Sequence, residues 1–192
     1  YEDGNGVEQD YAEAARLYRL AADQNDPDAQ GFLGGLYEMG NGVEQDYSKA
    51  ARLYSLAADQ DDADARYNLA ALYDSGSGVE EDHAEASRLY ELAAKTWKLK
   101  VHEGSDGQYA QESLANAYEK GKGVPQDDFE AARLFRAAAK RGNELALYNL
   151  ARLYREGRGV EKDLLRVKRL LRAAAAGKNH TEIRDGEVLR VH

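Results

Sequence analysis

A four-residue motif, Gly-x-Gly-Val, occurs five times in this chain of 192 residues. The intervals between successive first glycines are 36, 36, 45 and 36 residues. A fixed period of this length indicates a repeat array, in which each repeat packs only on its neighbours. The spacing therefore constrains the fold more than any other feature of the sequence. The first glycines of the five motifs are Gly4, Gly40, Gly76, Gly121 and Gly157.

Each motif is followed by the pattern of an amphipathic helix, which we name the B helix of the repeat. An aspartate stands three residues after every motif valine, where its carboxylate would accept the N–H groups of a first helical turn. Three repeats add a glutamate three residues later, the spacing of a capping box. The sequence then reads Arg-Leu-aromatic-x-x-Ala-Ala, and only the last repeat lacks the aromatic residue. The aspartates are Asp10, Asp46, Asp82, Asp127 and Asp163, and the glutamates are Glu13, Glu85 and Glu130.

A second helical pattern, the A helix, precedes every motif from the second onward. It repeats Ala-x-x-x-Leu-(Gly or Ala)-x-x-Tyr, which places the apolar residues on one helical face. Asp26-Pro27 predicts the start of one A helix, because a capping aspartate is followed by proline. The first motif glycine suits the left-handed residue that ends a helix. We expect the motif valine to lie between the two helices of the hairpin.

The 45-residue interval carries nine extra residues between Ala94 and Tyr109. The apolar spacing predicts that the B helix continues here to about His102 and stops at Gly104, about 2.5 turns beyond its neighbours. Trp97, the only tryptophan, lies in this extension. We consider two interpretations of Trp97: a ring packed under the extended helix, or an exposed anchor for a partner.

The two ends of the chain depart from the repeat pattern. Residues 1–4 match the last turn of an A helix, so the first repeat lacks most of that helix. We expect one side of its B helix to be uncovered, which predicts a fragment of a longer array or self-association through this helix. The last B helix, from Leu164 to about Ala176, is basic on its outer face, as suits a capping helix. Asp185-Gly186 predicts a β-hairpin in the tail.

Charge is distributed unevenly along the chain. Residues 1–90 contain 20 acidic and 6 basic residues, for a net charge of −14, whereas residues 91–192 contain 15 and 20, for +5. This asymmetry is consistent with two binding surfaces, and also with drift among solvated helix faces. The acidic half argues against a nucleic-acid partner, since such binding depends mainly on the neutralisation of phosphates.

No group of residues has the spacing of a catalytic or cofactor site. The chain has no cysteine, which excludes disulfides and thiolate ligands. Two aspartate-rich turns, 23–28 and 59–64, lack the glycine and glutamate of a calcium-binding loop. The Gly-x-Gly motifs lack the strand and third glycine of a nucleotide-binding turn, and no apolar run is long enough to span a membrane. We therefore predict no cofactor, no metal and no catalysis. The four histidines, which have no metal-ligand spacing, are His83, His102, His180 and His192.

The unit Ala-x-x-x-Leu-Gly-x-x-Tyr-x-x-Gly-x-Gly-Val-x-x-Asp-x-x-x-Ala resembles the Sel-1-like repeat, a relative of the tetratricopeptide repeat. The resemblance covers residues 1 to about 177. It implies an all-α, right-handed superhelical solenoid of helical hairpins, with the A helices lining the concave face. It also implies an adaptor or scaffold protein of a kind common in bacteria, and it favours a periplasmic or secreted location over a cytoplasmic one. The implied divisions are a partial repeat 1–26, repeats 27–62, 63–106 (with an insertion at 95–107), 107–142 and 143–177, and a tail 178–192.

If the A helices line a groove, their residues off the core face become candidate contacts for a protein or peptide partner. Tyr67 and Tyr148 occupy equivalent positions and are the expected aromatic anchors. Arg152 and Arg155 are expected to clamp a carboxylate of the partner. Every candidate is equally consistent with ordinary helix surface. The predicted contacts are Glu38, Met39, Tyr67, Asp74, Glu112, Asn116, Glu119, Tyr148, Arg152 and Arg155, and the same face includes Gly31, Gly35 and Ala71.

We therefore predict a non-catalytic interaction module that holds a peptide or protein segment in its groove. Two alternatives stay open. A few similar proteins are linked to β-lactam binding or hydrolysis, although those resemble cysteine-rich repeats and this chain has no cysteine. The other alternative is a structural array that associates with itself.

Overall fold

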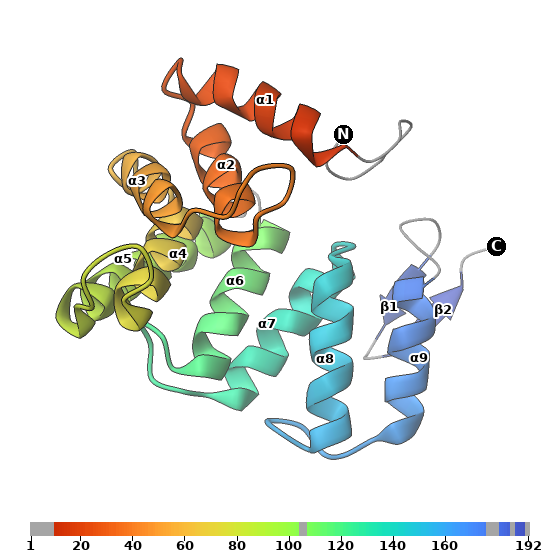
Figure 1. Ribbon diagram of the computed structural model, residues 1–192. Coiled ribbons are helices and arrows are strands. Elements are labelled where there is room, and N and C mark those ends of the chain that lie inside the picture. The colour runs from red at the N-terminus through yellow and green to blue at the C-terminus, as the bar shows by residue number, and fades with distance from the viewer. Residues whose placement is uncertain (1–9, 104–106, 176–180, 185–186, 191–192) are drawn as a thin grey trace. The chain divides into compact units, whose positions relative to one another are not determined.

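The computed structural model describes residues 10–103, 107–175, 181–184 and 187–190. These residues form nine α-helices and one two-stranded hairpin (Figure 1), which confirms the predicted all-α repeat fold. The chain divides into two compact units, residues 1–93 and 94–192, and we describe each by itself.

In the first unit, B and A helices alternate along the chain and pack on one another in sequence order. The second unit continues the same alternation. The A helices are α2 (Pro27–Met39), α4 (Ala63–Ser75), α6 (Gly107–Lys120) and α8 (Glu144–Glu156). The B helices are α1 (Tyr11–Ala22), α3 (Tyr47–Ala58), α5 (His83–Glu103), α7 (Asp128–Lys140) and α9 (Leu164–Ala175). The boundary between the units falls within α5.

The aspartate after each motif caps its B helix, as the sequence predicts. All five carboxylates accept backbone N–H groups of the first turn, at 2.9–3.0 Å. The predicted capping boxes do not form at Glu85 and Glu130, because the N–H groups of Asp82 and Asp127 donate to tyrosine carbonyls instead. The carboxylates of all three glutamates, Glu13 included, each accept two bonds from the arginine three residues later.

The two glycines of a motif have different structural roles. Gly157 ends α8 in the left-handed region, with φ of 73°, and its N–H donates to the carbonyl of Leu153 at 2.8 Å. Gly159 has φ of 63°, and a Cβ built on it would lie 1.9 Å from the carbonyl oxygen of Asp128. The second glycine of the loop at Gly42 meets the backbone of Tyr11 in the same way. Each such loop therefore contacts the start of the preceding B helix too closely for any side chain.

Alanine, leucine and aromatic residues make up the core between the helices. Ala50, Ala57 and Ala70 are fully buried and let the helices of the first unit approach closely. Val43 and Val79 are half-buried against the two core clusters of that unit, in line with the expected position of the motif valine. Core contacts thus follow the repeat period, with one layer for each hairpin.

The irregular segments also follow the sequence predictions where they are described. Helix α5 runs to Glu103, about where its end is predicted, and Gly104 lies outside the described residues. The predicted tail hairpin is present, with β1 (Thr181–Arg184) antiparallel to β2 (Glu187–Arg190), and β2 contacts α9. Its turn and residues 1–9, with the first motif, lie outside the described residues. The uncovered side of the first B helix therefore stays a prediction, as do the repeat boundaries.

Alanine substitutions in the last loop separate the two glycine roles. We expect Gly157→Ala to lower the free energy of unfolding by about 1–2 kcal/mol, the cost of a left-handed residue with a Cβ. Gly159→Ala adds a clash with the Asp128 backbone, so we expect a loss of about 3 kcal/mol or more. Urea unfolding followed by the fluorescence of Trp97 measures both variants in the second unit. Equal losses would contradict the close approach described above.

Candidate functional site

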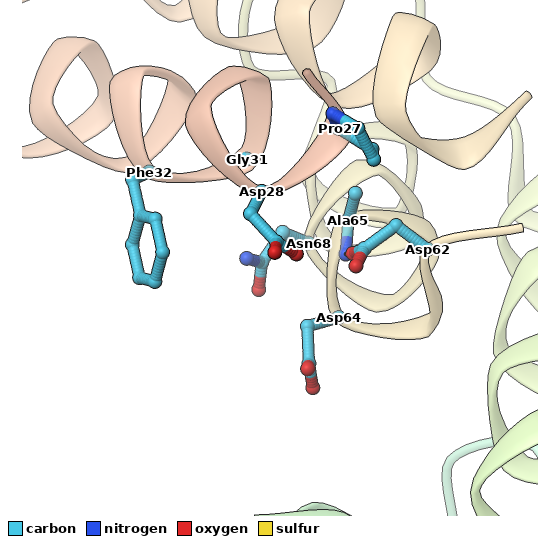
Figure 2. Close-up of a pocket in the computed structure, with 8 residues that line it drawn as sticks. All are labelled: Pro27, Asp28, Gly31, Phe32, Asp62, Asp64, Ala65 and Asn68. Carbon is cyan, nitrogen blue, oxygen red and sulfur yellow. The ribbon is translucent and has the colours of Figure 1, made fainter. Parts of the chain in front are cut away.

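A small pocket of about 150 Å³ lies between the N-terminal turns of two consecutive A helices, α2 and α4. Asp28 and Asp64 occupy equivalent positions on these helices, and both side chains are exposed. Figure 2 shows the ring of Phe32 on one side of the opening, Asp62 and Asp64 on the other, and Asp28 and Asn68 between them. Phe32 is 54% exposed. The pocket is lined by Pro27, Asp28, Gly31, Phe32, Asp62, Asp64, Ala65 and Asn68.

The A helices of the second unit present apolar side chains at the same repeat position. Tyr109 and Leu145 stand where the first unit has Asp28 and Asp64, and they are 59% and 64% exposed. Tyr148 lies one turn along α8 from Leu145 and is 47% exposed. Leu145 and Tyr148 therefore form a neighbouring exposed pair on one helix face. At this repeat position the side chain changes from acidic in the first unit to apolar in the second.

Within the first unit, a buried tyrosine binds one carboxylate of this surface. The hydroxyl of Tyr54 donates to Oε2 of Glu38 at 2.7 Å, and Tyr54 itself is buried. Burial raises the pKa of Tyr54, and the bond to Glu38 raises it further. The aromatic ring of Tyr54 also explains Gly34, because a Cβ there would lie 2.8 Å from it.

In the second unit, two arginines bind the equivalent carboxylate. Glu119 is buried, and its oxygens accept bonds from Arg152 at 2.6 Å each and from Arg158 at 2.9 Å. Arg158 also donates to both oxygens of Asp128, at 2.7 and 3.0 Å. This four-residue network joins α6 and the start of α7 to α8 and its following loop. The network therefore connects the last two repeats through ion pairs.

The network sets the ionisation of Glu119. Burial by itself would raise the pKa of this carboxyl group. The hydrogen bonds from Arg152 and the positive charges of Arg152 and Arg158 outweigh burial, so the pKa of Glu119 is lowered. The carboxylate is therefore ionised and fully engaged at neutral pH.

A second, wider hollow of about 700 Å³ lies at the last loop and the start of α9. Its polar groups bond to one another. Arg166 donates to the hydroxyl of Tyr154 at 2.7 Å and pairs with the capping Asp163 at 3.3 Å. Arg136 donates to the same hydroxyl at 3.0 Å. Burial opposes ionisation of Tyr154, but these arginines lower its pKa. These hydrogen bonds and this ion pair therefore stabilise the end of the array. We assign no ligand to the hollow.

Comparison with known proteins identifies the repeat. The model of the Sel1 repeat matches the chain five times, at residues 1–26, 27–62, 63–95, 108–143 and 145–179. The chain belongs to the Sel1 repeat family. The family resemblance inferred from the Gly-x-Gly-Val motifs is thus confirmed. Sel1 repeats in general form protein–protein interaction modules.

Solved structures support the same assignment. A protective antigen present in uropathogenic Escherichia coli strains, which displays an SLR fold, is 33% identical over 92% of this chain, with a TM-score of 0.50. A Sel1 repeat protein from Oxalobacter formigenes is 29% identical over 93% of this chain, with a TM-score of 0.53. This chain covers 36% of the first of these proteins and 70% of the second. No protein of curated function matches significantly.

The structure places the ten predicted contacts of the Sel1 array in different environments. Met39, Tyr148 and Arg155 are exposed. Tyr67 is half-buried, with its ring edge-on to Tyr90 at 4.9 Å between centroids. The carboxylates and amide among them bond internally: Glu38 to Tyr54, Asp74 to His83, Glu112 to Asn116, and Glu119 to Arg152.

The structure shows contacts within the chain for two of these residues, and it shows the burial of Trp97. The guanidinium of Arg152 binds Glu119 of its own chain. Glu119 is buried in that pair, and the partner contacts predicted for both residues stay predictions. Trp97 is only 3% exposed, which favours the packed interpretation of its ring over the exposed anchor.

Four lining residues of the pocket were missed by sequence reasoning: Asp28, Phe32, Asp64 and Asn68. The A-helix position of Phe32 holds Asn68, Ser113 and Asn149 in the other Sel1 repeats. An aromatic side chain at a position that is otherwise polar was the available signal. Gly31, on the predicted face, does line the pocket.

The described part of the chain contains neither a cluster of metal-ligating residues nor a membrane-spanning helix. Its residues contain no group of three or more histidines and carboxylates arranged to hold a metal ion. None of its helices combines the length and apolar character needed to cross a membrane.

Removal of one arginine tests the network in the last two Sel1 repeats. We expect Arg152→Ala to lower the free energy of unfolding by about 2 kcal/mol, because it leaves a buried carboxylate with fewer partners. Removing one partner of a fully buried ion pair costs about 3–5 kcal/mol. We expect a smaller loss here, because Arg158 still binds Glu119. Arg155→Ala, on the same helix but exposed, is the control and should change stability by less than about 0.5 kcal/mol. Urea unfolding of the two variants measures the difference, and similar effects would contradict the role of Arg152.

The same network predicts loss of stability in acid. The pKa of Glu119 is lower in the folded chain than in the unfolded one. Its contribution is therefore present above the ordinary glutamate pKa of about 4.3, and is lost as the pH falls through the folded value. We expect the amide protons of α6 and α8 to lose protection below about pH 4, relative to the unfolded chain at the same pH, and the difference in protection between wild type and Arg152→Ala to narrow there. Hydrogen–deuterium exchange of the whole chain measures this, and a constant gap from pH 7 to pH 3 would exclude the mechanism.

Proposed function

We propose that this Sel1 array binds an extended segment of a partner protein across the outer side chains of its A helices. The observation that carries the proposal is the exposed aromatic residue, beside further exposed groups, on an A helix of each unit. In the first unit Phe32 stands next to Asp28 and Asn68. In the second unit Tyr148 stands next to Leu145.

The energetics of protein recognition support this choice of surface. A few aromatic and arginine side chains supply most of the binding free energy in protein interfaces. Exposed apolar residues also occur on B helices, as at Leu56, and isolated cases are ordinary. Leu145 and Tyr148 are neighbours on one face of α8 and include an aromatic ring, whereas the exposed neighbours Leu17 and Leu20 on B helix α1 do not. The proposal therefore assigns function to the exposed aromatic residues of the A helices and their neighbours, and treats Leu56 as background.

A library of random displayed peptides, selected on the purified chain, provides the test. We expect the selected peptides to bind the double variant Leu145→Ala with Tyr148→Ala at least about tenfold more weakly than wild type, because both side chains are removed from the apolar surface. Leu56→Ala, on B helix α3, serves as the matched control. Fluorescence anisotropy with labelled peptides gives each dissociation constant. The proposal is wrong if the peptides bind the double variant unchanged, or if no peptide is selected.

A further inference from the structure

Gly31 carries a conformational cost that the fold does not require. It lies inside α2, where glycine is less stable than alanine by about 1 kcal/mol. Its backbone is not in the left-handed region, and a Cβ built on it meets no atom within 4 Å. Gly34, three residues on, has a steric reason in the ring of Tyr54, whereas Gly31 has none. The equivalent A-helix positions hold Tyr67, Glu112 and Tyr148, so large side chains fit this helical site.

The absence of a side chain at Gly31 keeps the pocket between α2 and α4 open. Gly31 is part of the lining, so a tyrosine there would project into the space. The volume of about 150 Å³ is well below the roughly 300 Å³ at which sites for whole small molecules begin. A pocket of this size suits one side chain of a bound segment.

The charge of the pocket selects a cation. Asp28, Asp62 and Asp64 supply three carboxylates, and none of the eight described lining residues is basic. The N-terminal ends of α2 and α4 oppose them with about half a positive charge each. Asp62 also caps α4 through the N–H of Ala65, and the carboxylates of Asp28 and Asp64 carry the remaining negative charge of the lining.

The aromatic ring of Phe32, on one side of the pocket, also favours a cation. The exposed ring of Phe32 is stacked on the ring of Tyr18 of α1, with centroids 5.2 Å apart. This contact orients the Phe32 ring before any ligand arrives. Cations bind the faces of aromatic rings, and guanidinium groups do so most often. The chain already contains such a contact, with Lys49 over the ring of Tyr37 at 5.2 Å.

We propose that the Gly31 pocket receives one basic side chain, an arginine or lysine, from the segment that the array binds. The cation lies against Phe32 and bonds to the carboxylates of Asp28 and Asp64. This inference rests on the proposed function and adds a specificity to it: a segment bound at the A helices of the first unit carries a basic residue. A side chain as large as the tyrosine of the equivalent positions would fill the pocket.

A small probe tests the pocket without a partner protein. N-acetyl-arginine amide and N-acetyl-lysine amide are titrated into the isotope-labelled whole chain and followed by nuclear magnetic resonance. We expect at least one of them to shift the amide signals of the lining residues, with weaker binding at high salt. N-acetyl-norleucine amide, which lacks the charge, should shift none of them. The pocket assignment is overturned if neither cationic probe shifts these signals, or if the shifts persist in Gly31→Tyr.

Matched variants separate pocket filling from damage to the fold. Gly31→Ala and Gly35→Ala should both keep the fold, since each replaces a helical glycine with a better helix former. Gly31→Tyr places in α2 the residue that two equivalent positions already hold. Thermal unfolding verifies that all three variants fold. A Gly31→Tyr chain that fails to fold would itself contradict the claim that the fold does not need this glycine.

The selected peptides then separate this inference from the proposed function. We expect them to share a basic residue, and we expect Gly31→Tyr, or replacement of that residue by norleucine, to weaken binding about tenfold or more. Gly35→Ala should leave binding unchanged. Peptides that depend on Leu145 and Tyr148 but tolerate Gly31→Tyr would overturn the pocket and leave the proposed function intact. Peptides that ignore Leu145 and Tyr148 would overturn the proposed function itself.

Discussion

The second glycine of a loop lies against the backbone at the start of the preceding B helix, and no side chain fits in that contact. The contact recurs at Gly42, Gly78 and Gly159. It sets the distance between consecutive hairpins, so the layered core, the capped B helices and the outer A-helix surface all depend on it. A repeat protein has no single core to correct an error in one layer. This explains why the Gly-x-Gly-Val motif is present in all five repeats.

The repeats differ in how they satisfy the carboxylate near the end of A helices α2 and α6. In the first unit, the hydroxyl of Tyr54 binds Glu38. The fourth repeat has Phe135 at the position of Tyr54, and a phenylalanine cannot donate. Its carboxylate, Glu119, is satisfied instead by Arg152 and Arg158 of the following repeat. A single change from tyrosine to phenylalanine thus accompanies a change from a bond within a repeat to a network between repeats.

The position of a residue within the repeat also separates structural residues from candidate functional ones. Positions that face the core, such as those of Ala70 and Leu69, hold small or aliphatic residues and are buried. Positions on the outer A-helix face vary in charge and size from repeat to repeat, because packing does not restrict them. Asp28 and Asp64 occupy one such position in the first unit, and Tyr109 and Leu145 occupy it in the second. The same fold can therefore present different surfaces in different repeats. At Gly31 the outer position has no side chain, and the pocket lies there.

Much of this architecture followed from the sequence alone. The repeat period, the helix ends, the five capping aspartates and the tail hairpin depend on residues close together in the chain, whose spacing is visible without coordinates. Only the tertiary structure decided which side chains of the predicted face are available. Arg152 and Glu119 look like surface residues in their own helices, but they meet across a repeat boundary and neutralise each other. The pocket at Gly31 likewise depends on side chains from two A helices and on the stacking of Phe32 against α1. Local spacing determines helices, whereas the exposure of a side chain depends on neighbours that are distant in the sequence.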